Sequence, residues 1–216
     1  MIVRCPKNMG EKPAGLIVVD LQLEKERRAI ASKTDRIPGE RLFLRRYGAI
    51  FKLTERALDA GLPIVLVRYT GNANPLDTKL ARMVGEKSVV EKDYYDGFDF
   101  SPHKFKRAPL TDKLIEKGLM PDKENPPLLL IGGFHADACV VYTVRGGIRI
   151  GYKFATSWRV LIGGTIAPEY SDGPKQDMKN RETARWYYQT MPGIEVMPFE
   201  NLLGLVGAKA EPGNRA

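Results

Sequence analysis

The sequence predicts a single α/β domain built on a mainly parallel sheet. Short apolar runs rich in β-branched residues alternate with segments whose apolar residues recur at helical spacing. This alternation is typical of βαβ units, in which each crossover helix packs on a parallel sheet. The 216 residues suffice for one sizeable core and are few for two. We therefore expect a three-layer α/β/α sandwich over residues 14–207, with a lead-in over 1–13 and a flexible tail over 208–216.

The strands are the clearest elements. Three runs are apolar almost throughout, as expected of parallel strands that helices cover on both faces: Gly15 to Asp20, Leu62 to Tyr69 and Pro127 to Gly132. Shorter β-rich segments at Ser88 to Glu91, Tyr152 to Thr156 and Ile194 to Met197 are expected to complete the sheet.

Helices are expected between these strands. Glu40 to Ala60 has apolar residues near helical spacing and stops before Gly61, a typical helix-ending residue. Further helices are predicted at Leu110 to Gly118, Ala138 to Ile148, Lys175 to Thr190 and Phe199 to Val206. Within Ala138 to Ile148, Gly146 and Gly147 are expected to weaken the helix by about 1 kcal/mol each.

Composition excludes several function classes. The net charge is +8, but the 34 basic residues are scattered among 26 acidic ones, which indicates a mixed surface and no nucleic-acid partner. No apolar run approaches the roughly 20 residues that span a bilayer, and the N-terminus lacks a signal-peptide core. We expect a cytoplasmic protein with no membrane partner. The two cysteines, Cys5 and Cys139, form no disulfide framework and lack zinc-ligand spacing; Cys5 has no evident role.

Three reactive side chains follow predicted strands. Asp20 closes the first strand, Lys92 follows the short one, and Cys139 begins the helix after the third. Ligands of open parallel sheets bind at the carboxyl ends of the strands. A helix N-terminus also favours a thiolate and supplies N–H groups for an oxyanion. A turn-making aspartate, a surface lysine and a structural cysteine would each explain one residue, but their joint placement favours a site.

These residues carry a family resemblance. The motifs are Asp20-Leu21-Gln22 at a strand end, Lys92 to Phe98, and the turn from Gly133 to Val140 with Thr143 one helical turn on. In order and spacing the chain resembles the isochorismatase-like cysteine hydrolases, which include nicotinamidases and N-carbamoylsarcosine amidohydrolase. The resemblance covers about residues 14 to 200.

The resemblance implies a mechanism. Cys139 resembles the nucleophile, Asp20 the base that takes its proton, and Lys92 the cation that holds both. It also implies a non-proline cis peptide between Phe134 and His135, and an oxyanion hole formed by the backbone N–H groups of His135 and Cys139. The implied activity is hydrolysis of a carbon–nitrogen bond, other than a peptide bond, in a small amide, carbamoyl or ureido compound through a thioester. Relatives are commonly dimers or tetramers, so a homodimer or homotetramer is expected.

One departure bears on cofactors. Nicotinamidases of this family bind a metal through an aspartate and histidines in the loop after the second strand, whereas residues 70–77 contain no histidine. We therefore expect no metal and no other cofactor. Polar and aromatic residues near the predicted strand ends are candidates for substrate contact: Gln22, Tyr69, Tyr94, Tyr95, Phe98, Phe134 and Trp158.

Two other functions remain open. An enol-ether hydrolase like isochorismatase would use Asp20 and Lys92 and leave Cys139 a bystander. A catalytically idle oligomeric binding protein of the same fold would need none of the three. A Rossmann-type dehydrogenase is discarded because no GxGxxG follows the first strand.

Overall fold

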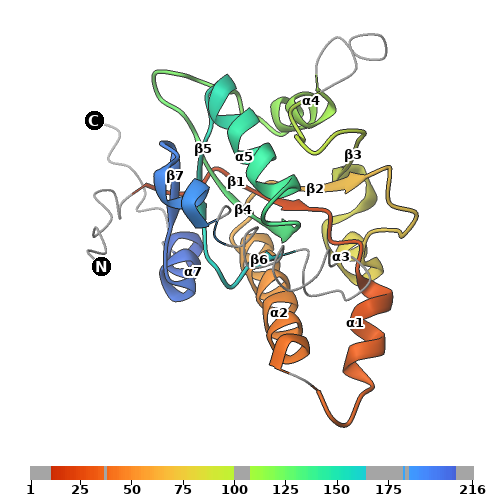
Figure 1. Cartoon of the computed structure of the whole chain (residues 1–216). Helices are drawn as coiled ribbons and strands as arrows, with labels where there is room; N and C mark the ends of the chain where they lie inside the picture. The colour runs from red at the N-terminus through yellow and green to blue at the C-terminus, as the bar shows by residue number, and fades with distance from the viewer. Residues whose placement is uncertain (1–10, 37, 100–107, 164–181, 183–184, 208–216) are drawn as a thin grey trace.

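The computed structural model describes residues 11–36, 38–99, 108–163, 182 and 185–207. Its centre is a seven-stranded sheet (Figure 1). The strands are β1 (Gly15–Val19), β2 (Ile64–Tyr69), β3 (Val89–Lys92), β4 (Leu128–Phe134), β5 (Lys153–Thr156), β6 (Leu161–Ile162) and β7 (Ile194–Val196). Their order is β3-β2-β1-β4-β5-β7, with β6 paired to β4. Every described strand pair is parallel, which confirms the predicted sheet.

Helices cover both faces of the sheet, as a three-layer sandwich requires. They are α1 (Glu24–Ala31), α2 (Pro38–Asp59), α3 (Thr78–Val84), α4 (Pro109–Glu116), α5 (Cys139–Ile150) and α7 (Phe199–Gly207). Alternate residues of β1 enter the two halves of the core: Leu16 and Val18 pack with α2 and α7, while Ile17 and Val19 pack with α4 and α5. Figure 1 shows these two pairs of helices on opposite sides of the sheet.

Three short elements, α1, α3 and β6, were not predicted from the sequence. Five of the eight residues of α1 are charged and only Ile30 is buried, so the segment lacks apolar residues at helical spacing. The seven-residue α3 is defined mainly by its N-cap, Asp77, whose side chain accepts from the N–H groups of Lys79 and Leu80. The strand β6 has two residues and depends on its pairing with β4.

Parts of the predicted organisation lie outside the described residues. Of the helix expected over Lys175 to Thr190, the structure describes residue 182 and residues 185–190, all helical. The tail over 208–216 and most of the lead-in are not described. Within the described part of the chain, no helix is both long and apolar enough to span a bilayer.

Candidate active site

Asp20 sits at the carboxyl end of the central strand β1 in a left-handed backbone conformation. Its φ is 51°, and its N–H donates to the carbonyl of Val67 over 2.8 Å. A non-glycine residue in this region is strained by about 1–2 kcal/mol, although aspartate tolerates it better than most. Asp20 is only 3% exposed. The strained backbone holds the carboxylate inside the protein at the strand end.

Lys92 reaches Asp20 across an intervening strand. It ends β3 and lies in register with Tyr69 of β2, while β2 separates β3 from β1. Two strand spacings amount to about 10 Å, which only a long side chain can bridge. The Lys92 ammonium lies 5.6 Å from the centroid of the Tyr69 ring and 2.9 Å from Asp20 Oδ2. It also donates to the carbonyl of Tyr95 over 3.0 Å. The two charged side chains thus form a buried ion pair.

Cys139 is the first residue of α5 and is 1% exposed. The turn that delivers it depends on Gly133 at the end of β4, where φ is 144°. A Cβ at this glycine would overlap the Val19 carbonyl of the neighbouring strand. This close approach of β4 to β1 brings the start of α5 over Asp20.

The Cys139 thiol interacts with both members of the ion pair. Burial and the negative charge of Asp20 raise its pKa, while the positive charge of Lys92 lowers it, and the net effect is a rise to about 12. Desolvation and the adjacent carboxylate therefore outweigh the thiolate stabilisation that a helix N-terminus supplies. The resting group is the neutral thiol.

The Asp20 carboxylate retains capacity to accept a proton. Apart from the ion pair with Lys92, neither of its buried oxygens accepts a hydrogen bond of regular geometry. Unfilled acceptor positions are unusual in a buried carboxylate and cost free energy. Next to a neutral thiol, they suit a general base.

The turn before Cys139 differs from expectation at one peptide bond. Every peptide bond among the described residues is trans, so the cis bond expected between Phe134 and His135 is absent. The chain instead reverses through His135, whose φ is 57°. The carbonyl of His135 accepts from the N–H groups of Ala138 and Val140. Burial, chiefly, lowers the pKa of the His135 imidazole.

An aromatic ladder begins beside Lys92, whose ammonium contacts the Tyr69 ring and the Tyr95 carbonyl. The rings of Tyr69, Tyr95 and Tyr142 stack in series, with centroids 6.0 and 6.4 Å apart. Beyond Tyr142, the guanidinium of Arg145 lies 5.8 Å from the centroids of both the Tyr142 and Tyr187 rings. Tyr69 and Tyr95 are among the residues proposed from the sequence for substrate contact, whereas Tyr142 is not. Its position one turn after Cys139 on α5 was the available signal.

Gln22 is wholly engaged by the backbone. Its Nε2 donates to the carbonyls of Tyr69, Asn72 and Asn74, and its Oε1 accepts from the Tyr69 N–H. It is 1% exposed. The side chain therefore ties the end of β1 to the loop that follows β2.

The remaining predicted pocket residues lie in different surroundings. Phe98 is buried against Tyr152, with ring centroids 5.6 Å apart, and Phe134 is buried in the opposite half of the core. Tyr94 is 45% exposed. Trp158 packs its ring edge-on against Tyr188 at 5.5 Å. Phe98 and Cys139 belong to the same buried cluster, and Trp158 packs against it.

Tyr188 is a supporting residue that sequence reasoning missed. Its hydroxyl is fully buried and donates to the carbonyl of Ala136, in the turn before Cys139, over 2.9 Å. Tyr188 lies in a run of three aromatic residues, Trp186 to Tyr188, and nothing in this run indicates which ring makes the long-range contact. Trp158 packs on Tyr188 and therefore supports the turn before Cys139 indirectly.

The loop after β2 has an architectural role. Its Asp77 accepts from the Tyr47 hydroxyl and from two N–H groups at the start of α3. Among the residues that the structure describes, no group of three or more His, Cys, Asp or Glu side chains could hold a metal ion.

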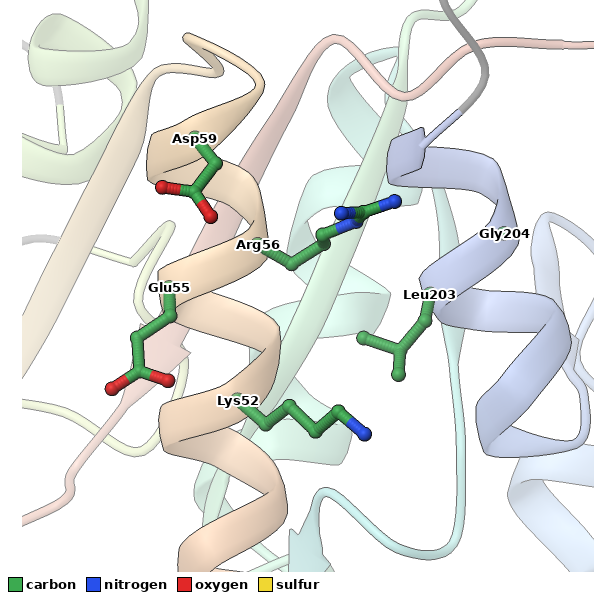
Figure 2. Close-up of a pocket in the computed structure, with 6 residues that line it drawn as sticks. All are labelled: Lys52, Glu55, Arg56, Asp59, Leu203 and Gly204. Atoms are coloured by element: carbon green, nitrogen blue, oxygen red, sulfur yellow. The ribbon is translucent and has the colours of Figure 1, made fainter.

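A separate surface hollow lies far from these groups. It measures about 360 Å³ and is lined by Lys52, Glu55, Arg56, Asp59, Leu203 and Gly204. Figure 2 shows Lys52 and Arg56 reaching from α2 toward α7. The last turn of α2 leads into the amino end of β2. The hollow therefore lies toward the amino ends of the strands, whereas Asp20 lies at their carboxyl ends. Its mixed charges converge on no reactive group.

Comparisons with known proteins agree on the fold. No family model and no curated protein sequence matches the chain. Solved structures do match: an isochorismatase from Pseudomonas putida KT2440 has a TM-score of 0.56 and 22% identity, covering 91% of this chain and 98% of that one. The nicotinamidase SaPncA from Staphylococcus aureus has a TM-score of 0.54 and 20% identity, covering 85% and 97%. The N-carbamoylsarcosine amidase from Thermoplasma acidophilum has a TM-score of 0.54 and 16% identity, covering 88% and 97%. The chain therefore has the isochorismatase-like α/β fold that its motifs predict.

Proposed function

We propose that the chain is a metal-independent cysteine hydrolase that cleaves a carbon–nitrogen bond in a small amide, carbamoyl or ureido compound. One observation carries the proposal: three side chains from separate strand ends, Asp20, Lys92 and Cys139, meet in a buried cluster. A buried charge pair beside a thiol is costly to maintain, and such arrangements concentrate at functional sites.

The first step follows from the protonation states. The Cys139 Sγ–H proton moves to Asp20 as sulfur attacks the carbonyl carbon, so that the base ionises the thiol only during the reaction. The positive charge of Lys92 stabilises the thiolate character that develops on sulfur during the attack. It also stabilises the Asp20 carboxylate before the proton is transferred. The backbone N–H groups of His135 and Cys139 are the proposed donors to the oxyanion. The first N–H groups of an α-helix have no acceptor within the helix, which suits Cys139 for this role.

The second half of the reaction returns every proton. The C–N bond breaks, and the leaving nitrogen takes the proton held by Asp20, which leaves a thioester on Cys139. Water then gives one proton to Asp20 and attacks the thioester, and the released thiol recovers that proton. The net change is the addition of water across one C–N bond, and no oxidant, metal or cofactor is required.

The aromatic ladder supports a planar substrate. Tyr95 and Tyr142 are 57% and 42% exposed, so part of each ring remains available beside the buried cluster. Flat amide and ureido groups stack well on tyrosine rings. We therefore keep Tyr69 and Tyr95 as proposed substrate contacts and add Tyr142.

A screen for ammonia release tests the proposal. The wild type and the variants Cys139→Ala, Asp20→Asn and Cys5→Ser are each incubated with candidate substrates in the presence of a metal chelator. The substrates are nicotinamide, N-carbamoylsarcosine, aliphatic amides and ureido acids. Loss of the nucleophile or base is expected to lower turnover by about 10²–10⁴-fold, while Cys5→Ser matches the wild type. Intact-protein mass spectrometry after rapid acid quench is expected to find an acyl adduct on Cys139. Turnover that survives in Cys139→Ala would refute the thioester mechanism.

A second candidate is an enol-ether hydrolase, favoured by one observation: the resting thiol is neutral, so Asp20 can exchange protons without it. In that case Asp20 acts as the acid, and Cys139→Ala retains activity on an enol-ether substrate such as isochorismate while Asp20→Asn does not. We further propose a homo-oligomer, which light scattering on the purified chain would test.

A further inference from the structure

Three consecutive residues, 95–97, contact both the Lys92 side chain and the nucleophile helix. The carbonyl of Tyr95 accepts from the Lys92 ammonium over 3.0 Å. The N–H of Gly97 donates to Thr143 Oγ1 over 3.0 Å, and that hydroxyl donates to the carbonyl of Cys139 over 2.7 Å. We call residues 95–97 the clasp. Through it, one short segment bears on two of the three reactive groups.

The middle residue of the clasp is fitted to α5 by a glycine. The Asp96 carboxylate lies so close to Gly146 that a Cβ there would overlap both carboxylate oxygens. Gly97 is equally confined, since its Cβ would meet Leu110 of α4 at 2.9 Å and Thr143 at 3.2 Å. The glycine that weakens α5 in isolation is therefore explained, because it admits the Asp96 side chain.

The charges around Asp96 set its ionisation. Burial, chiefly, raises the pKa of its carboxyl to about 6. The N–H of Phe98, which donates to Oδ1 over 2.8 Å, opposes this rise, as do Arg149 on α5 and Lys92 on β3, while Asp99 adds to it. At neutral pH the carboxylate is largely ionised at a cost in stability. A charge retained in a costly place is more typical of a functional residue than of a packing residue.

We propose that Asp96 is a positioning residue, which by docking on Gly146 holds the clasp so that Lys92 and Cys139 face Asp20 in reactive geometry. This inference rests on the proposed cysteine hydrolase. Asp96 touches none of the reacting atoms itself. It acts through the Tyr95 carbonyl on one side and through Gly97 and Thr143 on the other.

The test uses p-nitrophenyl acetate, which acylates a reactive thiol without requiring the natural substrate. In a Cys5→Ser background, where Cys139 is the single cysteine, nitrophenolate release and the acetyl adduct are followed from about pH 5 to about pH 9. Gly146→Ala and Asp96→Asn are compared with Gly48→Ala, a helical glycine whose Cβ meets nothing within 4 Å, and with Glu91→Gln, whose side chain is 60% exposed.

We expect Gly146→Ala to slow acylation about tenfold or more, because an error of about 1 Å in a reactive group costs up to about 10²-fold. Asp96→Asn is expected to slow it several-fold and to remove an inflection near pH 6 from the wild-type profile. Both controls match the wild type. If Gly146→Ala does not fold, Thr143→Val, which breaks the link to Cys139, replaces it with the same expectation.

Two failures are distinguishable. If acylation is normal in Gly146→Ala and Asp96→Asn, with an unchanged pH profile, while Asp20→Asn still abolishes it, the positioning role is refuted and the cysteine hydrolase stands. If the wild type forms no adduct on Cys139, or forms it equally well in Asp20→Asn, both proposals fall.

Discussion

The ammonium of Lys92 lies 2.9 Å from Asp20 Oδ2, and the two side chains are 1% and 4% exposed. Strand β2 lies between the strands that carry them, so the pair exists only because lysine is long enough to pass the end of β2 beside Tyr69. Two buried charges are stable only together, and this dependence makes the pair testable by stability as well as by activity.

Removing one member of the pair should destabilise the fold more than removing both charges. Lys92→Met leaves a buried, unpaired carboxylate and is expected to lower the free energy of unfolding by about 3–5 kcal/mol. The double variant Asp20→Asn/Lys92→Met is expected to be more stable than Lys92→Met alone. Denaturant titration measures both, and a double variant that shows the sum of two large losses would contradict a coupled buried pair.

The Cys139 thiol should respond to its two neighbours in opposite directions. Asp20→Asn removes the negative charge and is expected to lower the thiol pKa from about 12 by about 1–3 pH units. Lys92→Met is expected to raise it further. The absorbance of the thiolate is followed against pH in a Cys5→Ser background, and the absorbance of the Cys139→Ala variant is subtracted. This measures the thiol pKa in each variant. Asp20→Asn should then combine a more acidic thiol with lost turnover, and a thiol that becomes less acidic would overturn the assigned contacts.

Asp96→Asn should stabilise the protein at neutral pH. The folded carboxyl has a pKa near 6 against an ordinary 3.8, so the folded chain binds its proton more tightly than the unfolded chain does. The stability that this proton contributes is present below about pH 4 and is lost as the pH rises through about 6. This rise in the Asp96 pKa corresponds to at most about 3 kcal/mol in the free energy of unfolding. Because the side chain is 17% exposed, solvent screening reduces that figure.

Thermal unfolding across that pH range measures the effect. We expect Asp96→Asn to gain about 1–3 kcal/mol over the wild type at about pH 8, with the gain vanishing near pH 4. A gain at acid pH with none at neutral pH would have the wrong sign and would exclude a buried ionised carboxylate.

Gln22→Ala should disrupt the loop after β2. The variant loses four hydrogen bonds to the backbone. Their backbone partners in Tyr69, Asn72 and Asn74 are then left without the Gln22 side chain. The expected loss is about 2–4 kcal/mol. Gln189→Ala, at an exposed position, is the matched control and should change stability by less than about 0.5 kcal/mol. An equal effect of the two substitutions, measured by denaturant titration, would remove the structural role given to Gln22.

The main strands were predictable from local patterns. The apolar runs that form β1 and β4 are buried throughout, and β2 is buried over its first four residues, so none of them has the alternating polar positions of a half-exposed strand. Asp20, Lys92 and Cys139 were proposed as a site because each lies at or just after the end of a predicted strand. Elements held mainly by caps or by single pairings, such as α3 and β6, carry no comparable signal.

The supporting contacts were not predictable from one sequence. Tyr142, Asp96 and Gly146 acquire their significance from contacts between the 93–98 segment and α5, about 50 residues away in sequence. The net rise of the Cys139 thiol pKa was not predictable for a related reason. A helix N-terminus can be recognised in a sequence, but the depth of burial and the distance to Asp20 cannot.

The strand order has a consequence for how the chain acquires activity. Asp20 follows β1, Lys92 ends β3, and Cys139 begins the helix after β4, so the three residues meet only when these separate elements have assembled. During synthesis, a nascent chain in which α5 has not yet been made lacks Cys139, and a chain whose central strands are unpaired cannot bring Asp20 to it. Turnover by the proposed cysteine hydrolase would thus report native assembly, and could be used to time folding without any attached label.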